Sequence, residues 1–263
     1  MRKYYYIFKA NIMSNLQYIF NIMISFINYF ILIFIYLNVW QYIYSDPSKL
    51  IYHYSVQQMV WYVIITEMLW FATSGRILCQ NISNDVRSGN IAYNMNKPYS
   101  YIGYVLANHL GEILVSGLLY GTAGLIMGLI LLGGIPTLSL AYIPFILIVI
   151  IFSVIINTML ITVVGLISFW IEDSSPFYWL YSKLLLVFGV FFPIEFFPKY
   201  LQGFLQYSPV YVTIYGPAKL FVDFSYVNLF KIISVQTLYL VIAYLGCQYM
   251  YERGVRKLNV NGG

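Results

Sequence analysis

The segment RILCQNISNDVRSGNIAYNMNKP, residues 76–98, is the one extended polar stretch between two apolar blocks of membrane length. Three cations, Arg76, Arg87 and Lys97, lie within it. A connection between two membrane helices needs neither this length nor these charges, because most connections between helices are short. We therefore expect residues 76–98 to form a surface onto which another molecule docks.

The first half of this segment has helical periodicity. Leu78, Ile82 and Val86 recur every four residues, and polar residues occupy the other side of the same turns. This spacing predicts a short amphipathic helix, followed by a turn. The apolar side would anchor the helix, while Asp85 and Arg87 would supply hydrogen bonds and charges that fix the registry of a partner. The alternative is a helix that only rests on lipid headgroups.

The composition indicates a membrane protein. The 263-residue chain is 61% hydrophobic and only 9% charged, whereas soluble globular domains carry about 25% charged residues. This excludes a sizeable soluble domain, and we expect one all-α membrane domain over residues 1–263. The net charge of +5 reflects cations at the ends of spans, so we expect no nucleic acid partner.

About six apolar segments approach or exceed the roughly 20 residues that a helix needs to cross a bilayer core. The fifth of these segments is short. The predicted spans cover approximately residues 22–44, 56–75, 101–132, 141–170, 177–192 and 229–250.

The distribution of Lys and Arg sets the predicted orientation, because cytoplasmic loops are enriched in these residues. If the N-terminus is inside, only four of the fourteen Lys and Arg residues fall outside: Lys49, Lys199, Lys219 and Lys231. We therefore expect both termini, together with residues 76–98, on the cytoplasmic side.

Residues 1–21, ahead of the first span, predict an interfacial helix that lies in the membrane surface. Polar residues fall on one side of this helix. Apolar residues recur on the other side at steps of three or four: Tyr5, Phe8, Ile12, Leu16 and Ile19. The alternative is that the first span simply begins early.

Residues 192–226 are too apolar for an ordinary exposed loop. Prolines interrupt them too often for one spanning helix, because proline inside a helix removes a donor and kinks or ends it. These prolines are Pro193, Pro198, Pro209 and Pro217. Irregular backbone at membrane depth is tolerated only inside protein or beside water. We therefore expect short re-entrant or interfacial helices on the outer side.

The third predicted span is rich in glycine. Gly124 and Gly128, like Gly117 and Gly121, are four residues apart. Small residues at this spacing let membrane helices approach closely. The neighbour would be either another helix of this chain or a second membrane subunit.

The sequence contains no recognisable catalytic or metal-binding motif. Its two histidines do not combine with cysteines or carboxylates at metal-ligand spacing. Neither HExxH, GxSxG nor a phosphate-binding glycine loop occurs. We therefore expect this chain not to be an enzyme and to bind no metal or cofactor itself.

Glu67, His109 and Glu112 are ionisable residues that fall within predicted spans. A charged residue at the centre of a bilayer costs about 2.5 kcal/mol or more, so each is a candidate for function. A carboxylate would either pair structurally, with His109, Arg76 or Lys97 as partner, or take part in a proton relay. The chain shows no clear internal repeat of the kind that many secondary carriers have. A partner that supplies the energy is therefore the favoured hypothesis.

Three stretches resemble the membrane subunit, or permease, of type-2 ABC exporters with about six spans. Residues 87–112, RSGNIAYNMNKPYSYIGYVLANHLGE, carry a Gly-x-Ile, a Lys-Pro pair and the third span. Residues 169–209 carry an aromatic-acidic loop, a short fifth span and a Pro-x-x-x-x-Pro element. Residues 210–221, VYVTIYGPAKLF, carry a Tyr-x-Pro segment before the last span.

The resemblance implies a role for each segment. The helix that begins at Arg76 would be the coupling helix, which inserts into a groove on a separate ABC ATPase. Its coupling residues would be Leu78, Ile82, Asp85, Val86 and Arg87. Pro193, Glu195 and Pro198 would belong to the helices that close the outer mouth. ATP and Mg would be bound by the partner ATPase, and a second permease, identical or related, would complete the path.

The resemblance also implies a multi-pass protein of the bacterial cytoplasmic membrane, surrounded by lipid, that exports an amphipathic substrate. Such a substrate would be a lipid, a drug or an antimicrobial peptide. Aromatic residues of the spans would offer it a lateral path, or would simply pack; they include Trp61, Trp70, Trp170 and Trp179. Two alternatives stay open: a proton-coupled secondary carrier that uses Glu67 and Glu112, and a non-transporting sensor or scaffold subunit.

Overall fold

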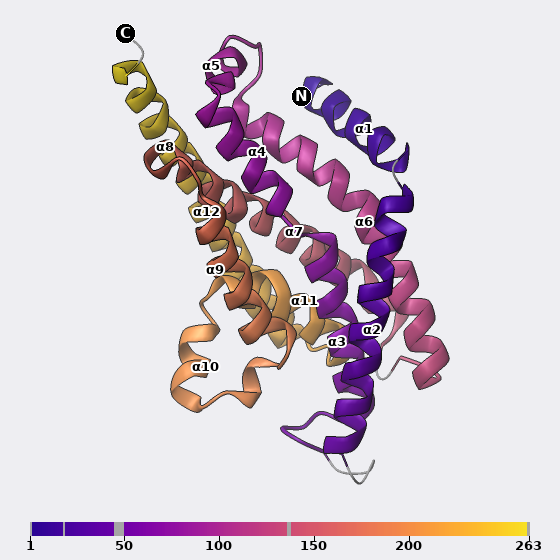
Figure 1. Cartoon of the computed structure of the whole chain (residues 1–263). Coiled ribbons are helices and arrows are strands. Elements are labelled where there is room, and N and C mark those ends of the chain that lie inside the picture. Colours follow the sequence, from indigo (N-terminus) through magenta and orange to yellow (C-terminus); the bar gives the residue numbers. More distant parts are fainter. Residues whose placement is uncertain (1, 18, 45–49, 136–137, 262–263) are drawn as a thin grey trace.

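The computed structural model describes residues 2–17, 19–44, 50–135 and 138–261, which are mostly helical (Figure 1). Within them, extended pairing is limited to one isolated bridge between Ile51 and Tyr54. The prediction of an all-α membrane protein is therefore confirmed. The elements are α1 (Arg2–Gln17), α2 (Ile19–Ile43), α3 (Val56–Ala72), α4 (Arg76–Arg87), α5 (Asn90–Met95), α6 (Tyr101–Leu132), η1 (Leu140–Tyr142), α7 (Ile143–Leu166), α8 (Ser168–Ile171), α9 (Ser175–Leu185), η2 (Leu186–Val190), η3 (Ile194–Phe196), α10 (Lys199–Leu205), η4 (Tyr211–Tyr215), α11 (Gly216–Val222) and α12 (Tyr226–Asn261).

Within the described residues, four helical segments are long and apolar enough to cross a membrane: Ile24–Ile43, Tyr101–Leu132, Leu140–Ile171 and Tyr226–Lys257. The other two predicted spans are helical but shorter. Helix α3 has 17 residues, and α9 has 11 residues before it continues into the five-residue π turn η2. At about 1.5 Å per residue, α3 is about 26 Å long, slightly less than the roughly 30 Å of a bilayer core.

Helix α3 forms the centre of the bundle, where it packs against α2, α6 and α11. It begins with a capping box, in which Ser55 and Gln58 each accept a hydrogen bond from the backbone N–H of the other. Trp61 and Tyr62 are completely buried on this helix. Burial of an aromatic side chain of this size is a large part of core stability, so α3 fixes the positions of its neighbours.

The glycines of α6 make close contacts inside this chain. A Cβ on Gly124 would collide with the hydroxyl of Tyr29, and one on Gly128 would collide with the indole of Trp61. Of the two predicted neighbours for this glycine pair, the structure therefore places a helix of the same chain against it.

The segments predicted to share one side of the membrane gather at one end of the molecule. Helices α1, α4 and α5 and the C-terminal end of α12 lie there, whereas α10 lies at the opposite end (Figure 1). Lys199 is on α10, and Lys49 lies outside the described residues. Helices α1 and α4 and the end of α12 therefore lie at one end of the molecule, and the assignment of that end to the cytoplasm stays a prediction.

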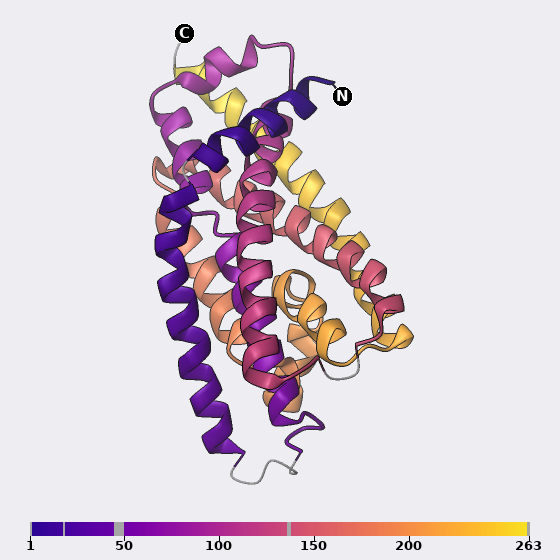
Figure 2. The same ribbon diagram turned by 90° about the vertical axis from the view of Figure 1, so that its right-hand side faces the viewer.

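Helix α1 is a separate helix that crosses the bundle next to α6 (Figure 2). It ends at Gln17, four residues earlier than predicted. On the predicted apolar side of this helix, Tyr5 and Leu16 are exposed, whereas Phe8 and Ile12 are half-buried. The interfacial position of the helix stays a prediction. The Asn11 amide donates to Asn108 Oδ1 of α6 at 3.0 Å and turns that side of α1 toward the bundle. The side chain of Ile19 lies outside the described part.

Residues 192–226 are broken into the short elements η3, α10, η4 and α11, as the prolines predict. Pro193 and Pro198 directly precede η3 and α10, with φ near −57° and −56°. Proline is tolerated at a helix start because an N–H there has no intrahelical partner to lose. The two prolines therefore set where these helices begin.

Candidate functional site

Helix α4 is anchored to the bundle by its apolar side. Leu78, Ile82 and Val86 are buried, and they belong to a core cluster shared with α7 and the start of α6. Gly165 of α7 leaves room for this contact, since a Cβ on Gly165 would lie 2.8 Å from Ile82 Cδ1. Helix α4 and α7 are therefore in direct contact.

A second attachment of α4 is polar. The hydroxyls of Ser83 and Ser174 are 2.7 Å apart, and Cys79 Sγ lies 3.1 Å from Ser174 Oγ. All three side chains are buried, and burial raises the pKa of the Cys79 thiol. This contact ties α4 to the residue that precedes α9, so α4 has two fixed neighbours.

Some of the residues on the outer side of α4 and next to it were predicted to contact a partner, and others were not. Arg87 is exposed, whereas Asp85 is half-buried and accepts a hydrogen bond from the hydroxyl of Tyr101 at 2.9 Å. Asp85 therefore already has a partner within the chain. Two exposed apolar residues, Ile77 in the first turn of α4 and Tyr93 on α5, were not predicted as contact residues. Ile77 lies outside the four-residue repeat, so periodicity gave no signal for it.

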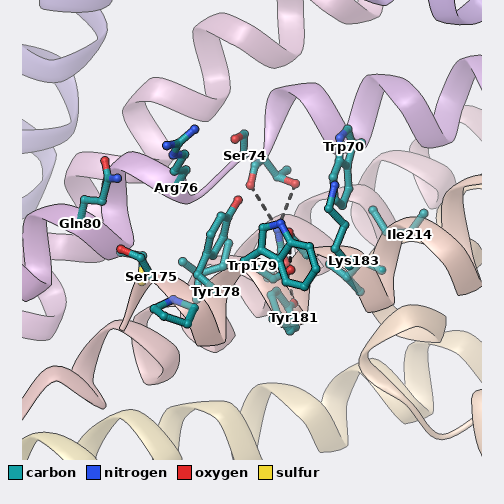
Figure 3. A pocket seen from close by; sticks show the side chains of 17 residues that line it. Trp70, Ser74, Arg76, Gln80, Ser175, Tyr178, Trp179, Tyr181, Lys183 and Ile214 are labelled. Atoms are coloured by element: carbon teal, nitrogen blue, oxygen red, sulfur yellow. Dashed lines mark hydrogen bonds between the residues drawn. The ribbon is translucent and has the colours of Figure 1, made fainter. Parts of the chain in front are cut away.

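A cavity of about 560 Å³ lies between α3, α4, α7 and α9 (Figure 3). Aromatic side chains form much of its wall, and Ile214 adds an aliphatic surface. The aromatic residues are Trp70, Tyr178, Trp179 and Tyr181. Ligand pockets in proteins typically measure about 300–1,000 Å³, so this cavity can hold a drug-sized molecule or part of a lipid.

Hydrogen bonds organise the polar part of this cavity. The Asn157 amide donates to Thr73 Oγ1 at 3.0 Å, and the Tyr181 hydroxyl donates to Asn157 Oδ1 at 2.7 Å. The backbone N–H of Gly75 donates to the Tyr178 hydroxyl at 3.1 Å. These polar groups and the aromatic wall together suit a molecule that has both a polar and an apolar part.

Only two of the four tryptophans predicted to form a lateral path line this cavity. Trp70 and Trp179 do. Trp61 is buried in the core and donates its indole N–H to the carbonyl of Gly134 at 2.8 Å, so it packs structurally. Trp170 is 40% exposed and does not line the cavity.

Helix α4 is itself one wall of the cavity. Arg76, Cys79 and Gln80 contribute to the lining from the same helix that carries Leu78 and Ile82. A displacement of α4 therefore changes the shape of the cavity. This relation between a surface helix and the cavity was not evident from the sequence, because segments far apart in the chain line the cavity.

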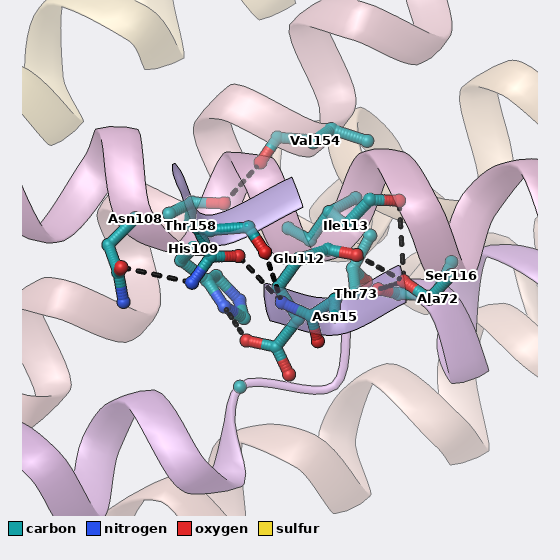
Figure 4. A network of polar contacts seen from close by, with 12 residues as sticks. Asn15, Ala72, Thr73, Asn108, His109, Glu112, Ile113, Ser116, Val154 and Thr158 are labelled. Atoms are coloured by element: carbon teal, nitrogen blue, oxygen red, sulfur yellow. Dashed lines mark hydrogen bonds and ion pairs between the residues drawn. The ribbon is translucent and has the colours of Figure 1, made fainter. Parts of the chain in front are cut away.

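The ionisable residues within the spans fall into one pair and one isolated group. His109 Nδ1 lies 3.1 Å from Glu112 Oε2 (Figure 4). Glu67 is buried, and neither of its carboxylate oxygens has a hydrogen-bond partner among the described residues. Arg76 and Lys97, the other predicted partners, make no ion pair with either carboxylate in the described part of the chain. Among the described residues, no polar contact joins Glu67 to Glu112.

A polar cluster surrounds Glu195 at the end opposite α4. The hydroxyls of Tyr215 and Tyr54 donate to Glu195 Oε1 at 2.6 and 3.1 Å. Lys219 Nζ lies 3.3 Å from the same oxygen and 2.8 Å from Asp223 Oδ2. The sequence did not reveal Tyr54 and Lys219 as partners, because Tyr54 is 141 residues from Glu195. This cluster joins η3, η4 and α11 to the residues just before α3.

Comparison with known proteins assigns the chain to a family. The family model described as ABC-2 family transporter protein matches residues 26–262, most of the chain. A search of curated proteins found no match.

Proposed function

Because this chain belongs to the ABC-2 family of transporter proteins, and is thus a permease subunit rather than an ATPase, we propose that it serves an ATP-driven exporter of an amphipathic substrate. The substrate would be a lipid, a drug or an antimicrobial peptide, moved across the bacterial cytoplasmic membrane. The observation that carries this proposal is the position of α4, which is both a surface helix and a wall of the aromatic cavity.

The cavity supports an amphipathic substrate through its two kinds of wall. Trp70, Trp179 and Ile214 offer apolar surface, whereas Asn157 and Thr73 offer polar groups at one side. Aromatic residues combine large contact area with a preference for the boundary between apolar and wet regions. A wholly polar solute would make no apolar contacts with the aromatic wall. A wholly apolar solute would displace water from the amide and hydroxyl groups without replacing its hydrogen bonds.

Coupling to ATP would pass through α4. The ATPase would contact its exposed side, which includes Ile77 and Arg87. Because Leu78, Ile82 and Val86 are buried against α7, a push on the exposed side would be transmitted to the bundle. Because one helix, α4, forms both the exposed surface and a wall of the cavity, these two parts would then move together.

The remaining parts of the assembly belong to other chains. ATP and Mg would be held by the partner ATPase, and a second permease, identical or related, would complete the path. Both termini and α4 would face the cytoplasm, and the cluster around Glu195, Pro193 and Pro198 would close the outer mouth. Residues 1–17 would lie at the surface of the lipid.

One observation favours a second candidate function, a proton-coupled secondary carrier. Glu67 is buried without a hydrogen-bond partner in the described residues, and such groups within membranes often carry protons. Glu112, paired with His109, would be the second titrating group. A sensor or scaffold subunit that does not transport is the third reading.

Reconstitution separates these functions. The chain would be purified with whatever ATPase accompanies it, placed in vesicles, and assayed for ATP-dependent movement of fluorescent amphiphiles. The exporter requires ATP and is insensitive to Glu67→Gln. Transport that needs a pH gradient, and that Glu67→Gln abolishes, would establish the carrier instead. ATP hydrolysis that no amphiphile stimulates would favour the sensor.

A further inference from the structure

The cavity between α3, α4, α7 and α9 carries two cations and no carboxylate. Arg76 and Lys183 are among its 17 lining residues, none of which is Asp or Glu. Neither cation makes an ion pair within the described residues. Asp173, two residues before the lining residue Ser175, accepts a hydrogen bond from the Ser175 N–H at 2.9 Å. The positive charge of the cavity wall is thus not neutralised by the lining itself.

Lys183 is the less expected of the two cations. It lies eight residues beyond Ser175, the first residue of α9, which places its Cα about 12 Å along that helix. Lys183 lies within a predicted span and its side chain is exposed. Lysines within spans are rare, and they commonly pair with an anion or mark a substrate path. The Lys183 ammonium lies 5.9 Å from the centre of the Trp179 ring, a weak contact that does not replace an anion.

Arg76 occupies the other end of the cavity. Figure 3 shows Arg76 with Gln80 at one end, and Lys183 with Trp70 and Ile214 at the other. A guanidinium binds phosphate or carboxylate oxygens through a planar fork of donors, whereas an ammonium acts as a point charge. The aromatic wall between them would hold an acyl chain or a ring.

We infer that this cavity admits amphiphiles with an anionic headgroup of the phosphate or carboxylate type, and that Arg76 and Lys183 select them. The inference rests on the proposed function, since it names the substrate class of the same cavity. A free inorganic anion shares the headgroup chemistry but has no apolar part to cover Trp70 and Trp179. The anionic amphiphile is therefore the occupant that satisfies both the cations and the aromatic wall.

The test measures binding to the full-length purified chain in a neutral detergent, without ATP. The probes are a fluorescent short-chain phosphatidic acid and the phosphatidylcholine with the same chains. Inorganic phosphate serves as a competitor. We expect the phosphatidic acid to bind at least about tenfold more tightly than the phosphatidylcholine, as charge-assisted hydrogen bonds predict. Phosphate alone should not displace it at equal concentration.

Variants identify the residues responsible. Lys183→Gln and Arg76→Gln should each reduce the preference, and the double variant should remove it. Lys183→Arg should retain it, which shows that the fold tolerates change at this position. Lys257→Gln removes an equal charge from an exposed position outside the cavity and should change nothing.

Three results overturn the inference. These are equal binding of the two lipids, a preference that survives the double variant, and displacement by phosphate as effective as by the lipid. Because no ATPase is present, the binding result is independent of whether the chain exports. Selective binding without ATP-driven transport would contradict the proposed function alone.

Discussion

The Ile82 side chain of α4 packs directly onto Gly165 of α7, where a Cβ would lie 2.8 Å from Ile82 Cδ1 and 3.1 Å from Ile82 Cβ. Both distances are shorter than an ordinary van der Waals contact, and the Ile82 Cβ, unlike the flexible Cδ1, cannot move away without a shift of the α4 backbone. Any side chain at Gly165 would therefore displace the helix that we assign to ATPase coupling.

Gly165→Ala should therefore destabilise the protein by about 1–3 kcal/mol, the usual effect of overpacking, and should reduce substrate-stimulated ATP hydrolysis. Thermal unfolding in detergent and an ATPase assay measure the two effects. Gly246→Ala is the matched control, because its Cβ would meet only Val163 at 3.5 Å. Ile82→Ala should partly rescue Gly165→Ala by restoring space. Equal effects of Gly165→Ala and Gly246→Ala, with no rescue of Gly165→Ala by Ile82→Ala, would contradict this account.

Thiol labelling should separate the two sides of α4. The Ile77→Cys variant should react with a maleimide, because Ile77 is 59% exposed. Native Cys79 should stay unlabelled at neutral pH, because it is buried and burial raises the pKa of its thiol, which leaves fewer reactive thiolates. Adding the partner ATPase should protect the introduced thiol. Unchanged labelling in the intact complex would remove Ile77 from the docking surface.

Charge reversal on α4 should weaken the ATPase complex. We expect the double variant Asp85→Lys, Arg87→Glu to lower ATPase recovery about tenfold or more, because charges at an interface fix registry and disfavour wrong pairings. Membrane insertion should be unaffected. Asp85 also accepts from Tyr101, so Arg87→Glu alone separates docking from that internal bond. Lys199→Glu on α10, at the opposite end, is the control. Full recovery of the ATPase with the double variant would argue against docking at this helix.

The Glu195 cluster should be energetically coupled. Tyr215 donates to Glu195 Oε1 at 2.6 Å, and hydrogen bonds to charged groups contribute about 1.5–3 kcal/mol. Because the Glu195 side chain is 31% exposed, we expect a coupling of about 1–2 kcal/mol between Glu195→Gln and Tyr215→Phe in a double-mutant cycle. Tyr52→Phe, at an exposed tyrosine, should show no coupling with Glu195→Gln. If the changes in free energy of unfolding of Glu195→Gln and Tyr215→Phe were strictly additive, the cluster would not hold η3 against η4.

Much of the fold follows from the sequence because the apolar lengths and the repeat of Leu78, Ile82 and Val86 are local signals. The prolines at positions 193 and 198 likewise mark helix starts through their own chemistry. The sequence does not show which side of a helix faces the bundle when both polar and apolar residues lie on its surface. Helix α1 illustrates this, since the Asn11 amide donates a hydrogen bond to Asn108 of α6, and Phe8 is half-buried on the predicted apolar side.

The candidate sites depend on contacts between distant segments, and no sequence periodicity reports these. The cavity forms only where segments far apart in the chain meet, so the sequence does not show that Lys183 and Asn157 line the same site. Tyr54 and Glu195 meet only after the whole chain has folded. Trp61 and Trp70 look alike in the sequence, yet one is a core residue and the other lines the cavity.

The most direct test of the central claim, that a separate ATPase drives this permease through α4, is a mild-detergent pull-down of the chain from its native membrane, followed by mass spectrometry. We predict that an ABC ATPase co-purifies with the native chain and is lost from the Asp85→Lys, Arg87→Glu variant, while a second permease stays bound to both. Recovery of the native chain alone, under conditions that preserve other membrane complexes, would contradict the claim and direct attention to Glu67.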